Sequence, residues 1–224
     1  MTRPIQRPLL CTAALAVALL AGCAAPVKTD YTALRAAKPA SILVLPPLND
    51  STDVKASFSM LSHVTYPLAE GGYYVMPVTL VNETFQQNGM TVAADMHEVP
   101  VAKLKEIFGA DAALYMKITK YGTTYTVLSS AAVVSAEARL VDLSSGALLW
   151  SGRASASSDE NNSNSGGGLA GLLVAAIVKQ IMNNVTDASH NVAGVTSTRL
   201  LSSGRPNGLL YGPRSPQYGK DNAN

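Results

Sequence analysis

The sequence predicts an α/β (α+β) fold in which helices pack on a mixed β-sheet of about five strands. Three observations predict it. Residues 42–45 form an apolar run, and segments with a helical spacing of apolar residues follow it. Residues 112–158 are rich in β-branched and aromatic residues and contain turn sequences, which indicates three antiparallel strands. Residues 169–182 are strongly apolar and predict a helix near the C-terminus.

The first half of the chain alternates predicted strands and helices. The apolar run at residues 42–45 stops at two prolines, and its lack of alternation is typical of a central strand that helices cover on both faces. Residues 54–69 predict a helix that a Gly-Gly pair ends. The apolar residues with helical spacing in that segment are Phe58, Leu61, Val64 and Leu68. The remaining predicted elements of this half are a short strand at residues 73–77 and helices at residues 79–87 and 101–108.

The second half begins with an alternating strand. Leu114, Met116 and Ile118 alternate with more polar neighbours, as expected for a sheet with one wetter face. Turn sequences then separate two further strands. Residues 159–168 predict a polar linker, and residues 202–224 have the Gly, Pro, Ser and Asn content of a disordered tail. One domain is therefore predicted over residues 39–201.

The first residues have the plan of an export signal. Two arginines precede the apolar run of residues 9–21, which is shorter than the roughly 20 residues that a membrane-spanning helix needs. The tetrapeptide Leu20-Ala21-Gly22-Cys23 then resembles the lipobox of bacterial lipoproteins, in which small residues precede an acylated cysteine. This resemblance implies a signal peptide over residues 1–22, and a lipidated N-terminus with its tether over residues 23–38.

Lipidation of Cys23 implies a protein held at a lipid bilayer. A diacylglycerol on the thiol and one acyl chain on the new amino group would give three acyl chains. Stable anchoring needs about two. Ala24 follows the cysteine, where an aspartate would resemble an inner-membrane retention signal, so the analogy implies the outer membrane. Whether the domain faces the periplasm or the exterior stays open. Cys11 lies in the predicted signal peptide, so the mature chain would form no internal disulfide.

The charge of the predicted mature chain is balanced. The full chain has 17 Lys and Arg and 15 Asp and Glu, and two of the arginines belong to the predicted signal peptide. A nucleic-acid-binding domain needs clustered basic residues on its folded part, and this sequence has no such cluster. We therefore expect no nucleic-acid partner.

The sequence holds no recognisable catalytic, cofactor-binding or metal-binding motif. Its three histidines are His63, His97 and His190, and none has a second histidine at the spacing of a zinc protease. Serines occur in no G-x-S-x-G motif, and the glycines before residue 169 lack the Gly-Lys-Ser/Thr of a phosphate-binding loop. We therefore expect a protein that is not an enzyme and has no cofactor. The acids Asp50, Asp53, Asp111 and Glu137 are most simply caps, turns and solvated faces.

Two interpretations suit the apolar segment at residues 169–182. It can be a core helix that covers the sheet, or a surface that is buried in a partner or in the bilayer, since large apolar patches are rarely left in water. Its small residues would allow close approach by another helix. The candidate partner surface consists of Ala170, Gly171, Val174 and Ala175.

Three blocks of the sequence resemble a known family: SILVLPPLNDSTDVKASFSMLSHVTYPLAEGGYYVMP, FGADAALYMKITKYGT and LVDLSSGALLW. The family comprises bacterial outer-membrane lipoproteins of unknown function, often encoded beside a lipoprotein similar to the curli secretion channel CsgG. The resemblance spans residues 31–201. It implies a fold similar to the N-terminal domain of TolB and to PelC, and offers no catalytic residues.

These observations favour one function and leave others open. The leading hypothesis is an outer-membrane-anchored lipoprotein that is a non-enzymatic accessory or assembly component of a cell-envelope complex. The resemblance implies a CsgG-like lipoprotein as its partner, and a homo-oligomer is the other possibility. The alternatives are an envelope lipoprotein that binds a small ligand and an envelope enzyme with an unrecognised site. A closed apolar pocket would favour the ligand binder, and convergent acids or histidines the enzyme.

Overall fold

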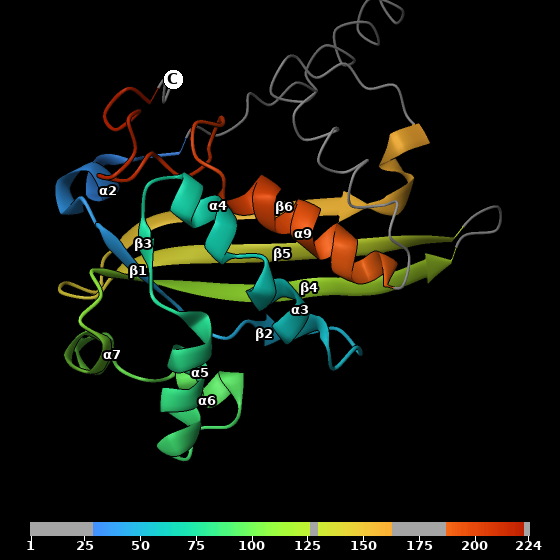
Figure 1. Cartoon of the computed structure of the whole chain (residues 1–224), viewed down its shortest axis with the longest axis horizontal. Coiled ribbons are helices and arrows are strands. Elements are labelled where there is room, and N and C mark those ends of the chain that lie inside the picture. The colour runs from blue at the N-terminus through green and yellow to red at the C-terminus, as the bar shows by residue number, and fades with distance from the viewer. Residues whose placement is uncertain (1–28, 126–129, 163–186, 222–224) are drawn as a thin grey trace, which may run out of the picture.

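The computed structural model describes residues 29–125, 130–162 and 187–221 (Figure 1). A mixed sheet runs in the order β3-β1-β4-β5-β6, and β2 also pairs with β4. The strands are β1 (Ser41–Val44), β2 (Leu48–Asn49), β3 (Tyr74–Val75), β4 (Ala112–Tyr125), β5 (Ser130–Asp142) and β6 (Leu148–Ser157). The helices are α2 (Thr32–Ala37), α3 (Ala56–Ser62), α4 (Thr65–Glu70), α5 (Val78–Gln87), α6 (Ala93–His97), α7 (Val101–Phe108) and α9 (Ala188–Leu201), with a 3-10 turn at Ser158–Asn162.

The predicted mixed α/β fold is confirmed. β1 lies between β3 and β4 and is parallel to both, so Ile42 pairs with Val75 on one side and with Ala112 on the other. β4, β5 and β6 form the predicted antiparallel meander. The central position of β1 explains why its sequence is apolar without alternation.

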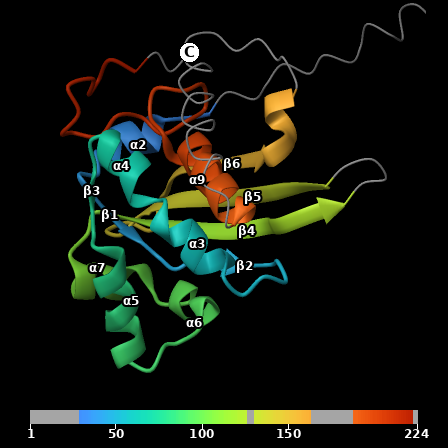
Figure 2. The ribbon, with the colours of Figure 1, turned by 45° about the vertical axis from the view of Figure 1, so that its right-hand side comes forward.

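Side chains of β1 and β4 divide the core between the two faces of the sheet. Ile42 and Val44 pack into a cluster with α3, α4 and α9, whereas Leu43 and Leu45 pack into a second cluster with α5, α6 and α7. Successive side chains of a strand point to opposite faces, so one strand serves both clusters. Figure 2 shows α3, α4 and α9 over one face of the sheet, with α5, α6 and α7 grouped near β1.

The predicted helix over residues 54–69 is two helices. α3 ends at Ser62 and α4 begins at Thr65, with His63 and Val64 between them. Pro67 lies in the first turn of α4, where a proline costs little because its missing N–H has no partner within the helix. Leu61, Val64 and Leu68 are buried as predicted, but Phe58 is exposed.

The prediction of a disordered tail is wrong for residues 202–221. Leu209 and Leu210 are 1% and 8% exposed, and the Tyr73 hydroxyl donates to the Leu210 carbonyl at 2.8 Å. The Gly212 N–H donates to the Gly71 carbonyl at 2.8 Å. A segment rich in Gly and Pro is ordered here because it pairs with backbone groups of the α4–β3 turn.

α9 also lay outside the predicted elements. Its buried face mixes apolar residues with Thr196 and Ser197, so it has no clear apolar stripe. The Thr196 hydroxyl donates to the carbonyls of Val134 and Val192, and the Ser197 hydroxyl donates to the His63 carbonyl. These bonds satisfy the hydroxyls and allow a polar sequence to form a core helix. The predicted helix at residues 169–182 lies outside the described residues.

Candidate functional site

An apolar groove lies beside the connection between β1 and β2, and we call it the Phe58 groove. Its volume is about 500 Å³. Three of its side chains are apolar and largely solvent-exposed: Val54 at 85%, Phe58 at 63% and Val92 at 55%. The rest of the lining is Pro46, Pro47, Leu48, Asn49, Asp50, Ser57, Leu61, Asn82, Gln86, Thr91, Ala93, Ala94 and Met96.

One wall of the groove results from the two prolines that end β1. Leu45 still donates its N–H to the Leu114 carbonyl at 3.1 Å, but a proline has no N–H to continue the ladder. The chain rejoins β4 only at β2, where Leu48 pairs with Lys117. The prolines therefore detach the connection from the sheet.

Short polar contacts hold this wall in place. The Asn49 side chain accepts bonds from the Ser51 N–H and hydroxyl at 2.9 and 2.7 Å, and it donates to the Asp53 carbonyl at 2.8 Å. The Ser57 hydroxyl, from the first turn of α3, donates to the Pro47 carbonyl at 2.9 Å. Phe58, the next residue, is therefore presented by a helix that is fixed to the connection.

α6 forms the opposite wall of the groove. His97, at the end of α6, connects it to the wall that contains Pro46 and Pro47. His97 Nε2 lies 2.9 Å from the Pro46 carbonyl, so this nitrogen carries the proton and donates. The His97 ring also meets the Tyr115 ring edge-on, with centroids 5.3 Å apart. Burial lowers the pKa of His97, although the bond to Pro46 opposes that shift. A neutral His97 therefore joins the two walls at neutral pH.

The groove is suited to binding rather than catalysis. Its lining combines the exposed apolar side chains of Val54, Phe58 and Val92 with the amides of Asn49, Asn82 and Gln86, which offer hydrogen bonds. Its one carboxylate, Asp50, forms an ion pair with Lys117 at 2.8 Å. General acid–base catalysis needs a positioned titratable side chain near the reacting group. An apolar peptide segment with polar flanks would match this lining.

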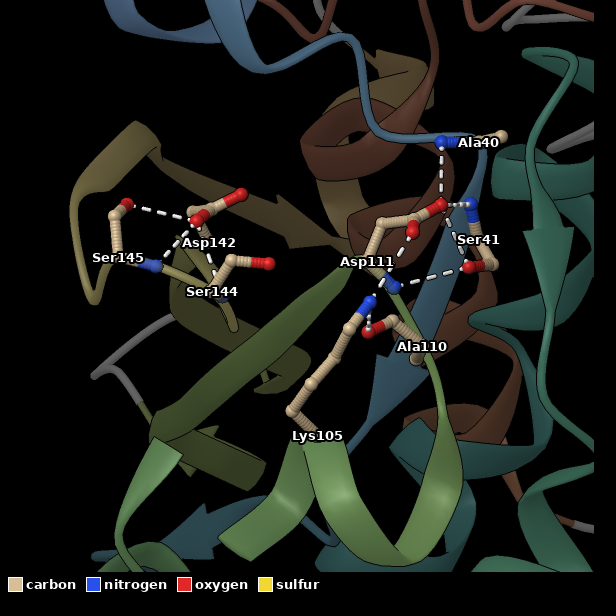
Figure 3. Close-up of polar contacts among 8 residues, drawn as sticks. All are labelled: Ala40, Ser41, Lys105, Ala110, Asp111, Asp142, Ser144 and Ser145. Carbon is tan, nitrogen blue, oxygen red and sulfur yellow. Dashed lines mark hydrogen bonds and ion pairs between the residues drawn. The ribbon is translucent and has the colours of Figure 1, made fainter. Parts of the chain in front are cut away.

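The Asp111 carboxylate accepts hydrogen bonds from residues at the start of β1 (Figure 3). It accepts bonds from the N–H groups of Ala40 and Ser41 at 3.0 Å and from the Ser41 hydroxyl at 2.9 Å. Lys105 Nζ lies 3.4 Å from its other oxygen. These hydrogen bonds outweigh partial burial and lower the pKa of Asp111. The carboxylate thus connects the start of β1 to the start of β4.

A second polar cluster joins α3, β4 and α9. The Tyr121 hydroxyl donates to the Ser59 hydroxyl at 2.8 Å, and Ser59 Oγ lies 2.8 Å from His190 Nδ1. A nucleophilic serine needs a base whose ring is oriented by a third group. Asp187 instead caps α9, where it accepts the N–H groups of Ser189 and His190. The cluster therefore fastens α9 to the sheet.

Some predicted site residues lie outside the described residues. These are Cys23 and the candidate partner surface of Ala170, Gly171, Val174 and Ala175. Within residues 29–125, 130–162 and 187–221, no group of three His, Cys, Asp or Glu side chains could hold a metal ion. No helix in that part of the chain is both long and apolar enough to cross a membrane.

The Phe58 groove was not predicted from the sequence. Phe58 fits the helical spacing of the buried residues Leu61, Val64 and Leu68, so periodicity alone assigns it to the core. The available signal was the Pro46-Pro47 pair, which predicts a chain segment that leaves the sheet. Which helices face that segment depends on contacts distant in sequence.

Comparisons with known proteins agree with this fold. Residues 29–214 match the family described as "Putative lipoprotein GNA1162-like". The chain is 50% identical over 185 residues to a protein of Neisseria meningitidis serogroup B described as "Putative lipoprotein NMB1124/NMB1162", and the match covers 83% of this chain and 85% of that protein. The crystal structure of lipoprotein GNA1162 from Neisseria meningitidis is 55% identical, with a TM-score of 0.52, and the match covers 65% of this chain and 100% of that one.

A more distant likeness is to a PelC dodecamer from Paraburkholderia phytofirmans. The identity is 16% and the TM-score 0.46, over 82% of this chain and 96% of that chain. At this identity and score the likeness says nothing about assembly or function. The family match and the half-identical relative each span most of the chain, and the protein therefore belongs to the GNA1162-like family of lipoproteins.

Proposed function

We propose that this protein is an outer-membrane lipoprotein, anchored by acyl chains on Cys23, that acts as a non-enzymatic accessory or assembly component of a cell-envelope complex. Its partner is a CsgG-like lipoprotein that places an apolar segment in the Phe58 groove. The lipobox-like sequence before Cys23 and the family membership support the anchor. Ala24 supports the outer membrane rather than the inner one.

The observation that carries the partner role is the exposure of Val54, Phe58 and Val92 around one groove. Apolar side chains gathered at a concave site mark a surface that another molecule covers. Burying each of them fully would contribute about 1.5–3 kcal/mol to association. The volume of about 500 Å³ admits a few side chains of a partner rather than a whole domain. An apolar stretch of the partner with polar ends therefore fits the groove.

The candidate surface of Ala170, Gly171, Val174 and Ala175 remains a second proposed contact. It would bind a like subunit or the same CsgG-like partner. Introducing charge with the double change Ala170→Glu and Val174→Lys should abolish association and leave the domain folded. If the double variant unfolds or associates like wild type, this surface is not an interface.

Affinity purification from gently solubilised membranes tests the partner role. The wild-type lipoprotein should recover a CsgG-like protein, and Phe58→Ser with Val92→Ser should lose most of it. A matched control changes two exposed apolar residues away from the groove, Tyr125→Ser with Leu148→Ser, and should recover as much as wild type. Equal recovery by all three proteins would exclude the groove as the docking site. Recovery of no CsgG-like protein by wild type would exclude the proposed partner.

A further inference from the structure

A pocket of about 320 Å³ lies between α2 and residues 210–221, which we call the C-terminal segment. We call this pocket the α2 pocket. Figures 1 and 2 both show α2 beside this C-terminal segment. The apolar part of its lining is Leu34, Pro39, Leu210 and Pro213, with Gly212 and Gly219. The polar part is Arg35, Lys38, Tyr73, Tyr211, Tyr218 and Asp221.

The lining of this pocket includes hydrogen-bond donors that have no partner in the described chain. Within the described chain, the side chains of Arg35 and Lys38 form no ion pair or hydrogen bond. The hydroxyls of Tyr211 and Tyr218 have no hydrogen-bond partner there either. Tyr73, by contrast, already donates to the Leu210 carbonyl. The Tyr211 hydroxyl lies against Gly204, outside the lining, so Arg35, Lys38 and Tyr218 are the donors that remain for a ligand of this partly apolar pocket.

The charge of the lining suits a ligand with one negative charge. Arg35 and Lys38 carry two positive charges, and Asp221 carries one negative charge. The Asp221 oxygens accept the Tyr211 N–H at 3.0 and 3.2 Å, so that carboxylate already has a role. A phosphodiester carries one negative charge and offers several acceptor oxygens, and Arg and Lys are common phosphate ligands.

Lys38 occupies a backbone position that favours glycine. It follows the last residue of α2 with φ 47° and ψ 51°, in the left-handed region. Glycine is the usual residue at this position of a helix end, because a side chain there is strained. A lysine at such a position is consistent with a role for its ammonium group in the pocket.

The pocket also lies close to the proposed anchor. Thr29 donates its N–H to the Asn207 side chain at 2.9 Å, and Tyr31 donates its hydroxyl to the Gly208 carbonyl at 2.6 Å. These bonds hold the start of the described chain against residues 207 and 208, which lie just before the segment that lines the pocket. Five residues separate Cys23 from Thr29, and such a tether reaches at most roughly 20 Å when extended. An acylated Cys23 would therefore keep this end of the domain at the headgroups.

We infer that the α2 pocket binds the glycerol phosphodiester of an anionic phospholipid headgroup. The phosphate lies among the donors of Arg35, Lys38 and Tyr218, and the glycerol carbons lie on the apolar part of the lining. This inference rests on the proposed anchor at Cys23, because the anchor brings lipid to the pocket. Bound lipid would fix the orientation of the domain on the membrane.

Native mass spectrometry of the detergent-solubilised lipoprotein, titrated with palmitoyl-oleoyl phosphatidylglycerol, tests the inference. Wild type should bind one molecule and should prefer it over phosphatidylcholine of the same chains. Arg35→Gln with Lys38→Gln should lower the affinity about tenfold or more, since hydrogen bonds to charged groups are lost. The matched control, Lys55→Gln with Lys120→Gln, removes two charges outside the pocket and should bind like wild type.

Lys38→Gly separates binding from folding. It relieves the left-handed strain, so the melting temperature should stay equal or rise while affinity falls. Binding that is unchanged in both pocket variants, or equal for both lipids, would overturn the inference. Calorimetry with inorganic phosphate tests the other source of the phosphate group. If inorganic phosphate binds as tightly as phosphatidylglycerol and the variants weaken both equally, the pocket is a free-phosphate site and the lipid assignment is overturned. Absence of acyl chains on Cys23 would refute the proposed anchor instead, because this titration does not depend on acylation.

Discussion

The imidazole rings of His63 and His190 are in contact, with centroids 4.4 Å apart and planes tilted by 43°. The contact brings the junction of α3 and α4 onto the first turn of α9. His63 Nε2 is buried and has no hydrogen-bond partner in the described chain, whereas His190 Nδ1 lies on the Ser59 hydroxyl. A proton added to His63 would therefore be buried beside a second imidazole.

Stability should fall as the pH drops below about 6.5, the ordinary pKa of histidine. Burial lowers the pKa of His63, and His190 lowers it further. Burial also lowers the pKa of His97. Below pH 6.5 the unfolded chain takes up protons that the folded chain does not, so the free energy of unfolding decreases. Urea melts at pH 7.5 and pH 5.5 would measure this loss.

The variants His63→Gln and His97→Gln identify the source of the loss. Each variant should reduce the difference in the free energy of unfolding between pH 7.5 and pH 5.5. The double variant should show the smallest difference. The absolute stability of each variant at pH 7.5 is the reference, because either change also removes packing. A double variant with the full wild-type loss would show that other groups cause it.

Gly152→Ala should disturb the single tryptophan of the chain. A Cβ at residue 152 would lie 2.3–2.5 Å from atoms of the Trp150 ring, so the ring must move. Movement would break the bond from Trp150 Nε1 to the Asn207 carbonyl, which is 3.1 Å long. We expect a destabilisation of about 1–3 kcal/mol from overpacking. Trp150 is the only tryptophan, so a red-shifted fluorescence spectrum would report its exposure directly. An unchanged spectrum and melt would contradict the observed packing.

Asp111→Ala should destabilise the domain by about 1–3 kcal/mol, since it leaves partly buried N–H groups without an acceptor. Those groups belong to Ala40 and Ser41. Asp111→Asn keeps one acceptor oxygen and should cost less. Chemical denaturation of both variants measures the difference. If both variants have the same denaturation midpoint as wild type, solvent already accepts hydrogen bonds from these N–H groups.

Leu43→Asp or Val44→Asp should destabilise the domain by several kcal/mol, because each places an unpaired charge in the core. Leu43 is 0% exposed and Val44 is 1% exposed, on opposite faces of β1. Thr124→Asp, at an exposed position of β4, is a milder comparison. Thermal melts equal to wild type would place β1 at the surface.

Cys23→Ala should abolish acylation and leave unprocessed or soluble protein. The expectation depends on the sequence Leu20-Ala21-Gly22-Cys23. Mass spectrometry of the wild-type N-terminus should find acyl chains on Cys23 and no residue before it. An unmodified peptide that continues through Gly22 and Cys23 would refute the lipobox assignment. Fractionation of the membranes by density would separately test the outer-membrane location.

The sequence predicts those elements whose signals are local. β1, the β4–β6 meander and α7 follow from apolar runs, alternation and turn residues that are adjacent in the chain. α9 escapes prediction because Thr196 and Ser197 are satisfied by acceptors that include the distant Val134 and His63 carbonyls. The same limitation applies to the Phe58 groove and to the C-terminal segment. Their positions depend on Pro46–His97 and Gly71–Gly212 contacts, which no local pattern encodes.

The docking of Gly212 onto Gly71 has a consequence for the order of folding. The α4–β3 turn is made early in synthesis, yet its carbonyls find their partners only among the last residues of the chain. Gly72 meets Ser215 so closely, with φ at 90°, that this corner tolerates no side chain. The β4–β6 meander pairs neighbouring segments and can form quickly, whereas closing such a distant contact is slow. During synthesis this corner therefore stays open until residue 212 has emerged, and an early stop would leave the Tyr73 hydroxyl and the Trp150 Nε1 without their acceptors.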